Sequence, residues 1–420
     1  MSNFEAAKQL FFEGLDLLAA YDYGAAEARF LASLSFVPDR ASTLANLSSA
    51  QLKLKKYDEA VASAERALSL NDGLAEAWLN LGLIQHELGS YKKALFFFDK
   101  ATERQPDYYD GYWNKALAQL VEGDFENGWR NYEFRWRMTN ADPVFQSTAP
   151  RLAGIENIHG KSILVWHEQG FGDTIQFARY VPLLVQRGAR VTFVTPPSLH
   201  SLFARQFDCV VVSRDVPRDD FDFQIPLLSL PLLFETDANS IPAAVPYISI
   251  PPQEVSEWKR VLPLSEGRLN IGIACSGSLS FDLQHGNNRP APLAVFAPLM
   301  DIANLFLIQK DIRDEDRAFL ERNPGITLTG SAIEDFEDSG AIVECMDMII
   351  SVDTSLAHLA GALGKKVYVL LQYSPDWRWL LDRDDSPWYP TATLIRQPTM
   401  GDWSAVMAQV EEEVRRFIPG

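Results

Sequence analysis

The sequence predicts an α-helical repeat array followed by an α/β region made of two halves, each with a parallel sheet. Three observations predict this fold class. Large and small residues recur with a period of 34 through the first third of the chain. Apolar, strand-like runs then alternate with helical segments, which is the order that builds parallel sheets. Two strand–loop–helix units with polar turns lie about 180 residues apart, so we expect two facing halves.

The repeat array is expected to span residues 1–142. Its period is set by four large residues, Leu10, Leu44, Trp78 and Tyr112. The same period aligns small residues at two further places, namely Gly14, Ser48, Gly82 and Ala116, then Ala26, Ala60, Ala94 and Gly128. It also aligns Phe30, Ala64, Phe98 and Tyr132. This pattern is the tetratricopeptide signature, in which each helix hairpin buries its apolar face by stacking on its neighbours.

Three asparagines share one position of successive repeats, on the first helix of each hairpin: Asn46, Asn80 and Asn114. Amides in a row can hydrogen-bond an extended peptide backbone whatever its sequence. The arrangement resembles the asparagine ladder of eukaryotic O-linked N-acetylglucosamine transferase. The alternative is that asparagine is a frequent residue of the repeat there and only helps solubility. We expect a protein or peptide partner for the array, as for most repeat solenoids.

A linker rich in Pro and Gly, residues 140–160, is followed by the first α/β half, and the two together span residues 143–265. Its predicted strands are residues 162–166, 191–194, 210–212 and 223–226, with helices at 175–186 and 196–205. Residues 241–252, rich in proline, are predicted to cross to the second half, residues 266–420. The strands expected there are residues 269–274, 305–308, 326–328, 346–350 and 365–371. A final amphipathic helix, residues 403–417, is expected to pack across both halves.

The second half contains a strand followed by the polar turn SVDTSLAH, residues 351–358. A helix is predicted over residues 354–363, which places Asp353, Thr354 and Ser355 at its cap and first turn. His358 lies one turn further on the same face. The unpaired N–H groups and the dipole of a helix N-terminus suit a phosphate, so this turn predicts a site for a nucleoside diphosphate. The alternative is an ordinary capping Asp and a surface His.

The first half contains a glycine-rich turn after its first strand. Gly170 and Gly172 allow the backbone to bend tightly and to approach a ligand. Asp173 falls in the first turn of the helix that follows. The dinucleotide fingerprint is excluded, because it requires a third glycine and a later acidic residue. The alternative for Asp173 is a plain helix-capping role.

Both turns carry a family resemblance. Residues 168–174 (EQGFGDT) and 352–364 (VDTSLAHLAGALG) resemble the two signature segments of glycosyltransferase family nine, which contains the lipopolysaccharide heptosyltransferases. The chain is most similar to bacterial members with tetratricopeptide repeats. Residues 376–390 (DWRWLLDRDDSPWYP), 396–398 and 401–403 continue the likeness. The resemblance implies a GT-B fold, a nucleotide-sugar donor, inverting transfer without a metal or other cofactor, and Asp173 as the general base.

Further residues are predicted to complete the donor site. Ser276 lies in a Gly-containing turn after the first strand of the second half, where a phosphate could enter. Arg289, with His285 and Asn288, partly matches the basic segment that the family usually shows there. Lys310 follows a strand and could neutralise a leaving diphosphate; the alternative is a solvated lysine. Trp377 and Trp379 are either stacking platforms or packing anchors, and the acidic pairs at 220/222 and 382/384 are interpreted as solvated.

The composition supports a large enzyme with real cores and disfavours several partners. Hydrophobic residues make up 47% of the 420, and the net charge of −18 disfavours nucleic acid and anionic membranes. The three cysteines lie in apolar contexts and indicate free thiols in a reducing compartment. No signal peptide, membrane span or metal-site spacing is evident. We therefore expect a cytoplasmic protein.

Together these features predict a fusion of tetratricopeptide repeats with a glycosyltransferase, transferring a hexose or heptose from a nucleoside diphosphate to an acceptor positioned by the repeats. Two alternatives remain open. One is a non-catalytic adaptor with a vestigial GT-B body. The other is a nucleotide-sugar epimerase or hydrolase on the same fold.

Overall fold

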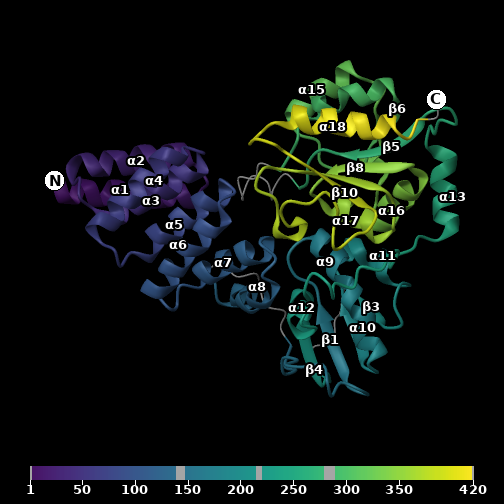
Figure 1. The fold of residues 1–420 in the computed structure, drawn as a ribbon, viewed down its shortest axis with the longest axis horizontal. Helices are drawn as coiled ribbons and strands as arrows, with labels where there is room; N and C mark the ends of the chain where they lie inside the picture. Colours follow the sequence, from purple (N-terminus) through teal and green to yellow (C-terminus); the bar gives the residue numbers. More distant parts are fainter. Residues whose placement is uncertain (1, 139–146, 214–219, 279–288, 419–420) are drawn as a thin grey trace. The chain divides into compact units, whose positions relative to one another are not determined.

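The computed structural model describes residues 2–138, 147–213, 220–278 and 289–418 (Figure 1). The chain forms two compact units, Met1–Ala141 and Asp142–Gly420. Three features predicted from the sequence lie outside the described residues: the boundary between residues 142 and 143, His285 and Asn288.

The first unit is a series of helix hairpins, as predicted. Its helices are α1 Asn3–Ala19, α2 Tyr23–Phe36, α3 Ala41–Lys53, α4 Tyr57–Leu70, α5 Ala75–Glu87, α6 Tyr91–Arg104, α7 Tyr109–Val121 and α8 Phe125–Tyr132, followed by the 3-10 helix η1 Glu133–Arg137. Consecutive helices pack against each other along the whole array. Each hairpin therefore covers the apolar face of its neighbour, which is how a solenoid builds a continuous core.

Residues that the 34-residue period aligns make close contacts between the two helices of a hairpin. A Cβ atom added to Gly14 would lie 2.5 Å from the ring of Phe30, and one added to Gly82 would lie 2.3 Å from the ring of Phe98. The aligned Ala60 is fully buried. The large residue of one helix thus fills the space left by the small residue of its partner, which confirms the physical basis of the repeat.

Replacing Gly82 with Ala is expected to lower the free energy of unfolding by about 1–3 kcal/mol, because the Phe98 ring has to shift in a filled core. Gly24→Ala is the matched control, since Gly24 is also helical and has nothing within 4 Å of an added Cβ. That variant should leave stability unchanged or raise it by up to about 1 kcal/mol. Urea denaturation followed by far-UV circular dichroism distinguishes the two. Equal stability of both variants would contradict the packing explanation.

The second unit contains two parallel sheets, which confirms the predicted α/β class. The smaller sheet has the order β3-β2-β1-β4 and the larger sheet the order β10-β9-β8-β5-β6-β7, with every pairing parallel. The smaller sheet comprises β1 Ser162–Trp166, β2 Arg190–Val194, β3 Val210–Val212 and β4 Phe223–Pro226. The larger comprises β5 Leu269–Ala274, β6 Ala303–Leu307, β7 Thr327–Leu328, β8 Met348–Val352, β9 Val367–Leu371 and β10 Ala392–Arg396.

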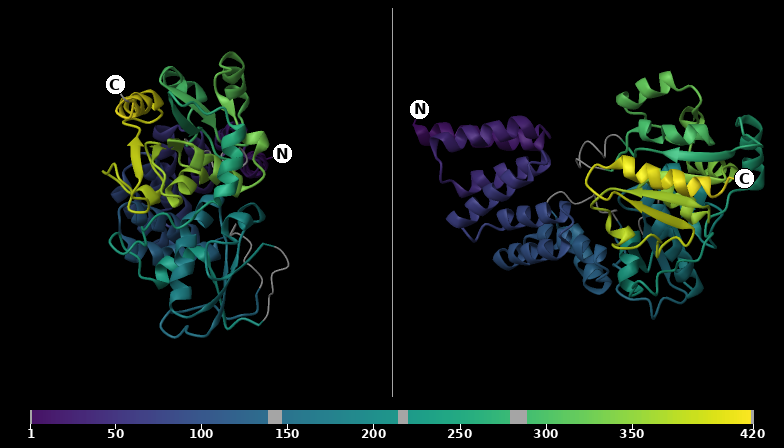
Figure 2. Two further views of the ribbon diagram at one scale, coloured as in Figure 1. Left: turned by 90° about the vertical axis from the view of Figure 1, so that its right-hand side faces the viewer. Right: turned by 45° about the horizontal axis from the view of Figure 1, so that its top comes forward.

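Helices connect the strands and cover the sheets (Figure 2). The first half contains α9 Phe171–Phe177, η2 Ala178–Tyr180, α10 Val181–Gln186, η3 Pro197–Leu199, α11 His200–Phe203, η4 Leu227–Ser229 and α12 Leu230–Leu233. The rest of the unit contains α13 Pro252–Val261, η5 Leu293–Asp301, α15 Asp314–Arg322, η6 Gly330–Ala332, α16 Phe336–Cys345, α17 Ser355–Ala362, η7 Trp377–Trp379 and α18 Trp403–Arg415.

Three details differ from the sequence prediction. The helix expected over residues 175–186 begins earlier, at Phe171, and is interrupted by η2; Pro182, near the start of α10, cannot donate a backbone N–H there. The strand β10 was not predicted. The apolar face of α18 belongs to the core of the larger sheet, where Val410 and Val414 are fully buried, rather than lying across both halves.

The acidic pair at residues 220 and 222 is also not simply solvated. Asp222 accepts hydrogen bonds from the backbone N–H of Ser162 at 2.8 Å and from its hydroxyl at 3.0 Å, and Lys161 lies at 3.1 Å. The bonds from Ser162 and Lys161 lower the pKa of Asp222 to about 2. Asp222 therefore fixes the beginning of β1 and has a structural role.

Candidate functional site

Two helix starts from different halves meet between the sheets: α9, which follows β1, and α17, which follows β8 (Figure 1). The contact is made possible by Gly172. A Cβ atom at this position would lie 2.7 Å from Cδ2 of His358 and 3.5 Å from Cα of Ser355. The glycine-rich turn and the DTS turn, predicted from separate parts of the sequence, thus lie against each other.

The carboxylate of Asp173 lies at this junction, in the first turn of α9. Its Oδ2 accepts the backbone N–H of Gly170 at 2.8 Å, and its Oδ1 forms an ion pair with Arg378 of the other half. Burial raises the pKa of Asp173, and the guanidinium of Arg378 opposes that rise. The preceding Gln169 has a φ of 57°, a left-handed conformation that is strained for a non-glycine residue and is often found at functional sites.

Arg378 is buried and is held from several sides. Its Nε donates to Oε1 of Gln176 on α9 at 2.7 Å, and its Nη1 donates to Oδ1 of Asp376 at 2.8 Å. The guanidinium also lies 4.3 Å from the centre of the Trp377 ring. The side chain therefore links η7 of the second half to α9 of the first.

The start of α17 is organised by Thr354, which is the N-cap. Its hydroxyl accepts the N–H of Leu356 at 3.3 Å and lies 3.0 Å from the hydroxyl of Ser351. Asp353 stands immediately before the cap. Burial and the neighbouring Asp376 raise the pKa of Asp353 to about 6, although Arg289 and Arg378 oppose the change. A buried carboxyl group with a raised pKa thus stands beside the helix N-terminus.

His358 is buried, so the alternative of a surface histidine is wrong. Its Nδ1 is 2.9 Å from the hydroxyl of Tyr389, and its ring stacks on Trp379 with centroids 5.4 Å apart. Burial lowers the pKa of His358 well below its ordinary value, and the nearby arginines act in the same direction. The imidazole is therefore neutral, with its Nε2 3.7 Å from Oδ1 of Asp353. Trp379 is both a packing anchor and a wall of the site.

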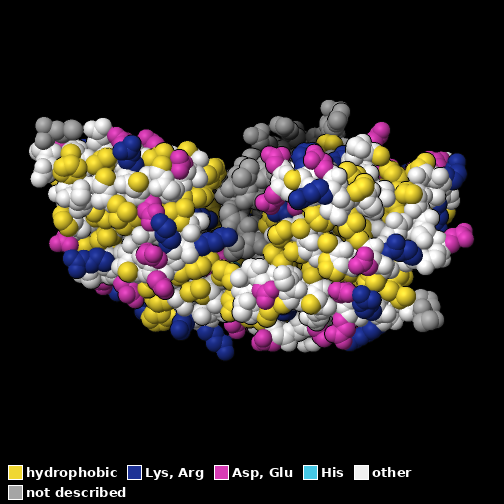
Figure 3. Space-filling model, turned by 90° about the horizontal axis from the view of Figure 1, so that it is seen from above, with side chains coloured by type: hydrophobic (Ala, Val, Ile, Leu, Met, Phe, Trp, Pro, Cys, Tyr) yellow, Lys and Arg dark blue, Asp and Glu magenta, His cyan; other side chains and the backbone are white. Residues whose placement is uncertain are grey.

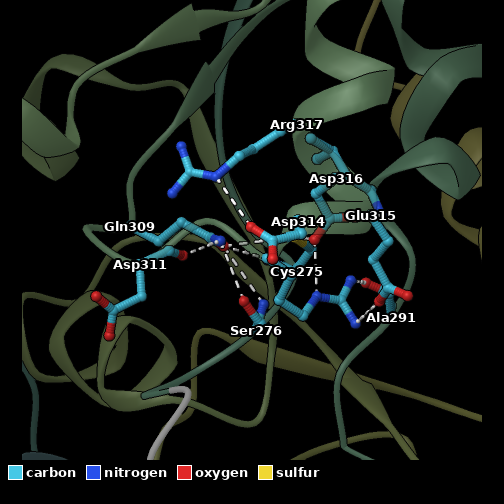
Figure 4. Close-up of polar contacts among 11 residues, drawn as sticks. Cys275, Ser276, Ala291, Gln309, Asp311, Asp314, Glu315, Asp316 and Arg317 are labelled. Carbon is cyan, nitrogen blue, oxygen red and sulfur yellow. Dashed lines mark hydrogen bonds and ion pairs between the residues drawn. The ribbon is translucent and has the colours of Figure 1, made fainter.

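The turn after β5 lies beside the start of α17. A Cβ atom at Gly277 would lie 2.8 Å from Nη2 of Arg289 and 3.7 Å from Cγ2 of Thr354. Ser276, however, is buried and already bonded, as Figure 4 shows. Oε1 of Gln309 accepts its N–H at 3.3 Å, and Nε2 of Gln309 donates to its hydroxyl at 3.1 Å. Gly277 and Arg289 therefore border the start of α17, whereas the side chain of Ser276 is held by Gln309.

Lys310 lies at the end of β6, as predicted, but its side chain is exposed. Its ammonium group donates to the backbone carbonyl of Glu334 at 3.0 Å. This arrangement favours the solvated alternative for Lys310.

The three asparagines of the repeats are in different surroundings. Asn46 and Asn114 are half-buried and donate to carbonyl oxygens one turn earlier in their own helices, at 2.9 and 2.8 Å. Asn80 is buried and donates to the carbonyl oxygen of Ala45 in the preceding repeat at 2.8 Å. The side chain of Asn80 therefore forms a hydrogen bond that joins two repeats, whether or not it also contacts a peptide.

Sequence reasoning assigned no role to four residues of the junction: Arg179, Asp376, Arg378 and Tyr389. Arg179 is buried in the first half and donates to the carbonyl oxygen of Trp388 in the second at 2.7 Å. Three of the four lie in residues 376–390, the segment whose family resemblance was noted without a role. The family resemblance could therefore have marked this segment as functional. The role of each residue, however, depends on its contacts with the other half, which the segment does not encode.

The surface charges of the described residues are mixed in sign. On the face shown in Figure 3, the basic side chains are interspersed with acidic ones. No group of three or more His, Cys, Asp or Glu residues within residues 2–138, 147–213, 220–278 and 289–418 is placed to hold a metal ion. In the same ranges no helix is both long and apolar enough to cross a membrane.

Comparison with known proteins confirms the repeats. Residues 41–73 and 75–108 each match a tetratricopeptide repeat family model. The chain is 24% identical to Protein FlbA of Caulobacter vibrioides, over 90% of this chain and 74% of that protein. It is 29% identical to small glutamine-rich tetratricopeptide repeat-containing protein 2 of Saccharomyces cerevisiae, over 30% of this chain and 34% of that protein.

Two solved glycosyltransferase structures match more than half of this chain. A family 9 glycosyl transferase from Veillonella parvula covers 62% of this chain and 96% of its own, with 12% identity and a TM-score of 0.46. A mutant O-GlcNAc transferase from Thermobaculum terrenum covers 100% of this chain and 94% of its own, with 14% identity and a TM-score of 0.39. At these scores the likenesses do not identify the activity of the chain.

Proposed function

We propose that the protein is an inverting, metal-independent glycosyltransferase that takes a hexose or heptose from a nucleoside diphosphate. The observation that carries this function is the junction of α9 and α17. There Asp173 stands in the first turn of α9 and pairs with Arg378 of the other half, and the neighbouring Gly172 packs on the start of α17, which Arg289 borders. The resemblance of residues 168–174 and 352–364 to the family signatures supports the same reading.

The donor diphosphate is proposed to bind at the start of α17. The N–H groups of the first turn of that helix and the guanidinium of Arg289 favour an anion. The same groups would stabilise the charge that develops on the diphosphate as its bond to the anomeric carbon breaks. His358, being neutral, would supply a hydrogen bond rather than a charge.

The acceptor hydroxyl is proposed to attack the anomeric carbon from the side of α9. A bond forms between the acceptor oxygen and that carbon, the bond to the diphosphate breaks, and Asp173 takes the hydroxyl proton. Burial raises the pKa of Asp173, which makes its carboxylate a stronger proton acceptor than an exposed one.

The repeats are proposed to present the acceptor or its carrier protein. Asn46 and Asn114 are half-buried on the first helices of their hairpins, so they remain candidates for contacts with a peptide. The three free cysteines fit a reducing compartment, and we place the protein in the cytoplasm.

A non-catalytic adaptor is the second candidate, and one observation favours it. Asp173 is already engaged by Gly170 and Arg378, and Ser276 is already bonded to Gln309. A vestigial site would retain such internal contacts without binding a donor. Measurement of donor binding separates the two candidates.

The test is a thermal-shift screen with UDP, GDP, ADP and CDP. A nucleoside diphosphate at about 100 times its dissociation constant should stabilise the protein by about 2.7 kcal/mol. For the nucleoside diphosphate identified in the screen, Arg289→Gln should lower the binding affinity by about 1.5–3 kcal/mol, roughly 10- to 150-fold, because a charge-assisted hydrogen bond is lost. Calorimetry on both proteins measures the difference.

Arg268→Gln is the matched control. Arg268 precedes β5 at the opposite end of the strand from Arg289, and it donates to the carbonyl oxygen of Met300 at 2.6 Å. Its replacement should leave affinity unchanged. A protein that is stabilised by none of the four nucleotides would support the adaptor.

A further inference from the structure

Arg378 is the only arginine of η7, and it reaches across the junction between the two halves. Its partner Asp173 is 205 residues away in the sequence, and Gln176, its second partner on α9, is 202 residues away. The two lie one turn apart on the same helix. The guanidinium therefore contacts two places on α9 while it remains attached to the second half through Asp376.

The orientation of the guanidinium is set by contacts other than its ion pair with Asp173. Asp376 accepts from Nη1 at 2.8 Å and Gln176 accepts from Nε at 2.7 Å. One face lies 4.3 Å from the Trp377 ring. The planar guanidinium is thus held by a hydrogen bond at Nε, a second at Nη1 and a ring against one face, which leaves Nη2 directed at the carboxylate of Asp173.

We propose that Arg378 is the positioning residue for the base, holding the carboxylate of Asp173 in place through the ion pair at the junction of the two halves. This role rests on the proposed function of Asp173, because positioning has a consequence for catalysis only if Asp173 accepts the proton. Arg378 itself contacts the base and not the reacting atoms.

The electrostatic consequence has a definite sign. The pKa of Asp173 is raised by burial and by Asp376, and Arg378 is the largest influence that opposes the rise. Removing the guanidinium should therefore raise the pKa of Asp173 further. The charged or titratable groups around the junction come from several elements: Asp376 and Arg378 of η7 and its cap, Asp353 and His358 of the α17 segment, Tyr389, Arg289, and Arg179 of η2.

The test measures the titration of Asp173 directly in the full chain. Carbon-13 NMR of protein labelled at aspartate Cγ follows the carboxyl resonances with pH, and Asp173→Asn identifies the resonance of Asp173. Arg378→Gln should move its midpoint upward by about one pH unit or more, which corresponds to a tenfold change in the proton affinity. An unchanged or lower midpoint would overturn the proposal.

Arg205→Gln is the matched control. Arg205 forms an ion pair with Glu337 of α16 at 2.6 Å, so it also links the two halves, but through an exposed side chain that does not contact Asp173. Its replacement should leave the midpoint where it is. An equal upward shift in Arg205→Gln would show that contact between the halves, rather than Arg378, controls the carboxylate.

Arg378→Lys keeps the role testable if the Gln variant does not fold. A single ammonium retains the charge but cannot serve Asp173, Asp376 and Gln176 with the geometry of a fork. Its midpoint should move less than one pH unit. Once sugar transfer is measurable, its kcat should fall about 100-fold with the donor KM unchanged, because the base is misplaced.

A normal kcat in Arg378→Lys would overturn the positioning role. The proposed function is tested by a different variant. If Asp173→Asn remains active in sugar transfer, Asp173 is not the base, whatever the titration of the Arg378 variants shows.

Discussion

Turnover by the Asp173→Asn variant is expected to fall by about 100- to 10,000-fold, the effect of removing a general base. Donor affinity should change little, because the diphosphate is proposed to bind at α17 and not at α9. The measurement is the rate of sugar transfer at saturating donor and acceptor. If kcat and kcat/KM fall by the same factor, the contribution of Asp173 is made only in the transition state.

The Asn variant is itself a controlled change. Its amide oxygen can still accept the N–H of Gly170, which Asp173 accepts at 2.8 Å, so α9 should begin as before. Near-normal turnover would therefore exclude Asp173 as the base. The next candidates would be His167, whose pKa is lowered by burial, and Glu168, which already accepts the N–H of Leu228 at 3.0 Å.

The second large effect is expected from Arg179→Met, which should lower the free energy of unfolding by about 3–5 kcal/mol. The buried guanidinium donates to the carbonyl oxygens of Trp388 at 2.7 Å, Gln176 at 2.7 Å and Pro242 at 3.3 Å. It also donates to the hydroxyl of Tyr247 at 3.1 Å. Each buried acceptor left without its donor costs about 1–3 kcal/mol, and the losses partly relax.

Urea denaturation followed by tryptophan fluorescence measures this loss, and Arg187→Met is the matched control. Arg187 also lies over an aromatic ring, that of Phe234, at 4.7 Å. Its guanidinium is exposed and donates within its own helix, to Leu183 at 3.1 Å. Its replacement should cost less than about 1 kcal/mol. Equal stability of the two variants would contradict a linking role for Arg179.

Several parts of the site were predictable because each is encoded within a few residues. Gly172 and Asp173 come a few residues after the strand β1, so a tight turn with an acidic first helical turn could be inferred. The start of α17 was likewise predictable to within one residue: the helix was expected from residue 354, and Thr354 instead caps a helix that begins at Ser355. These predictions concern where a side chain stands along its own segment.

The surroundings of those side chains were not predictable from the same residues. Ser276 is held by Gln309, which comes from a different strand connection, and Lys310 is exposed at the end of its strand. In both cases the local pattern permitted a binding role. The neighbouring segment decided which polar partner the side chain has.

The sequence alone determined the repeat period, the order of the strands β1 to β9, and the polar turns at the starts of α9 and α17, because periodicity, glycine and capping residues act over a few neighbouring positions. Only the tertiary structure decided that Arg378 meets Asp173 and that Tyr389 and Trp379 bury His358. The physical reason is that each contact joins separate segments of the chain. Arg378 and Asp173 meet across the two halves, and His358 meets a segment of its own half that follows 31 residues later at Tyr389. Partners 205 residues apart carry no local signal of each other.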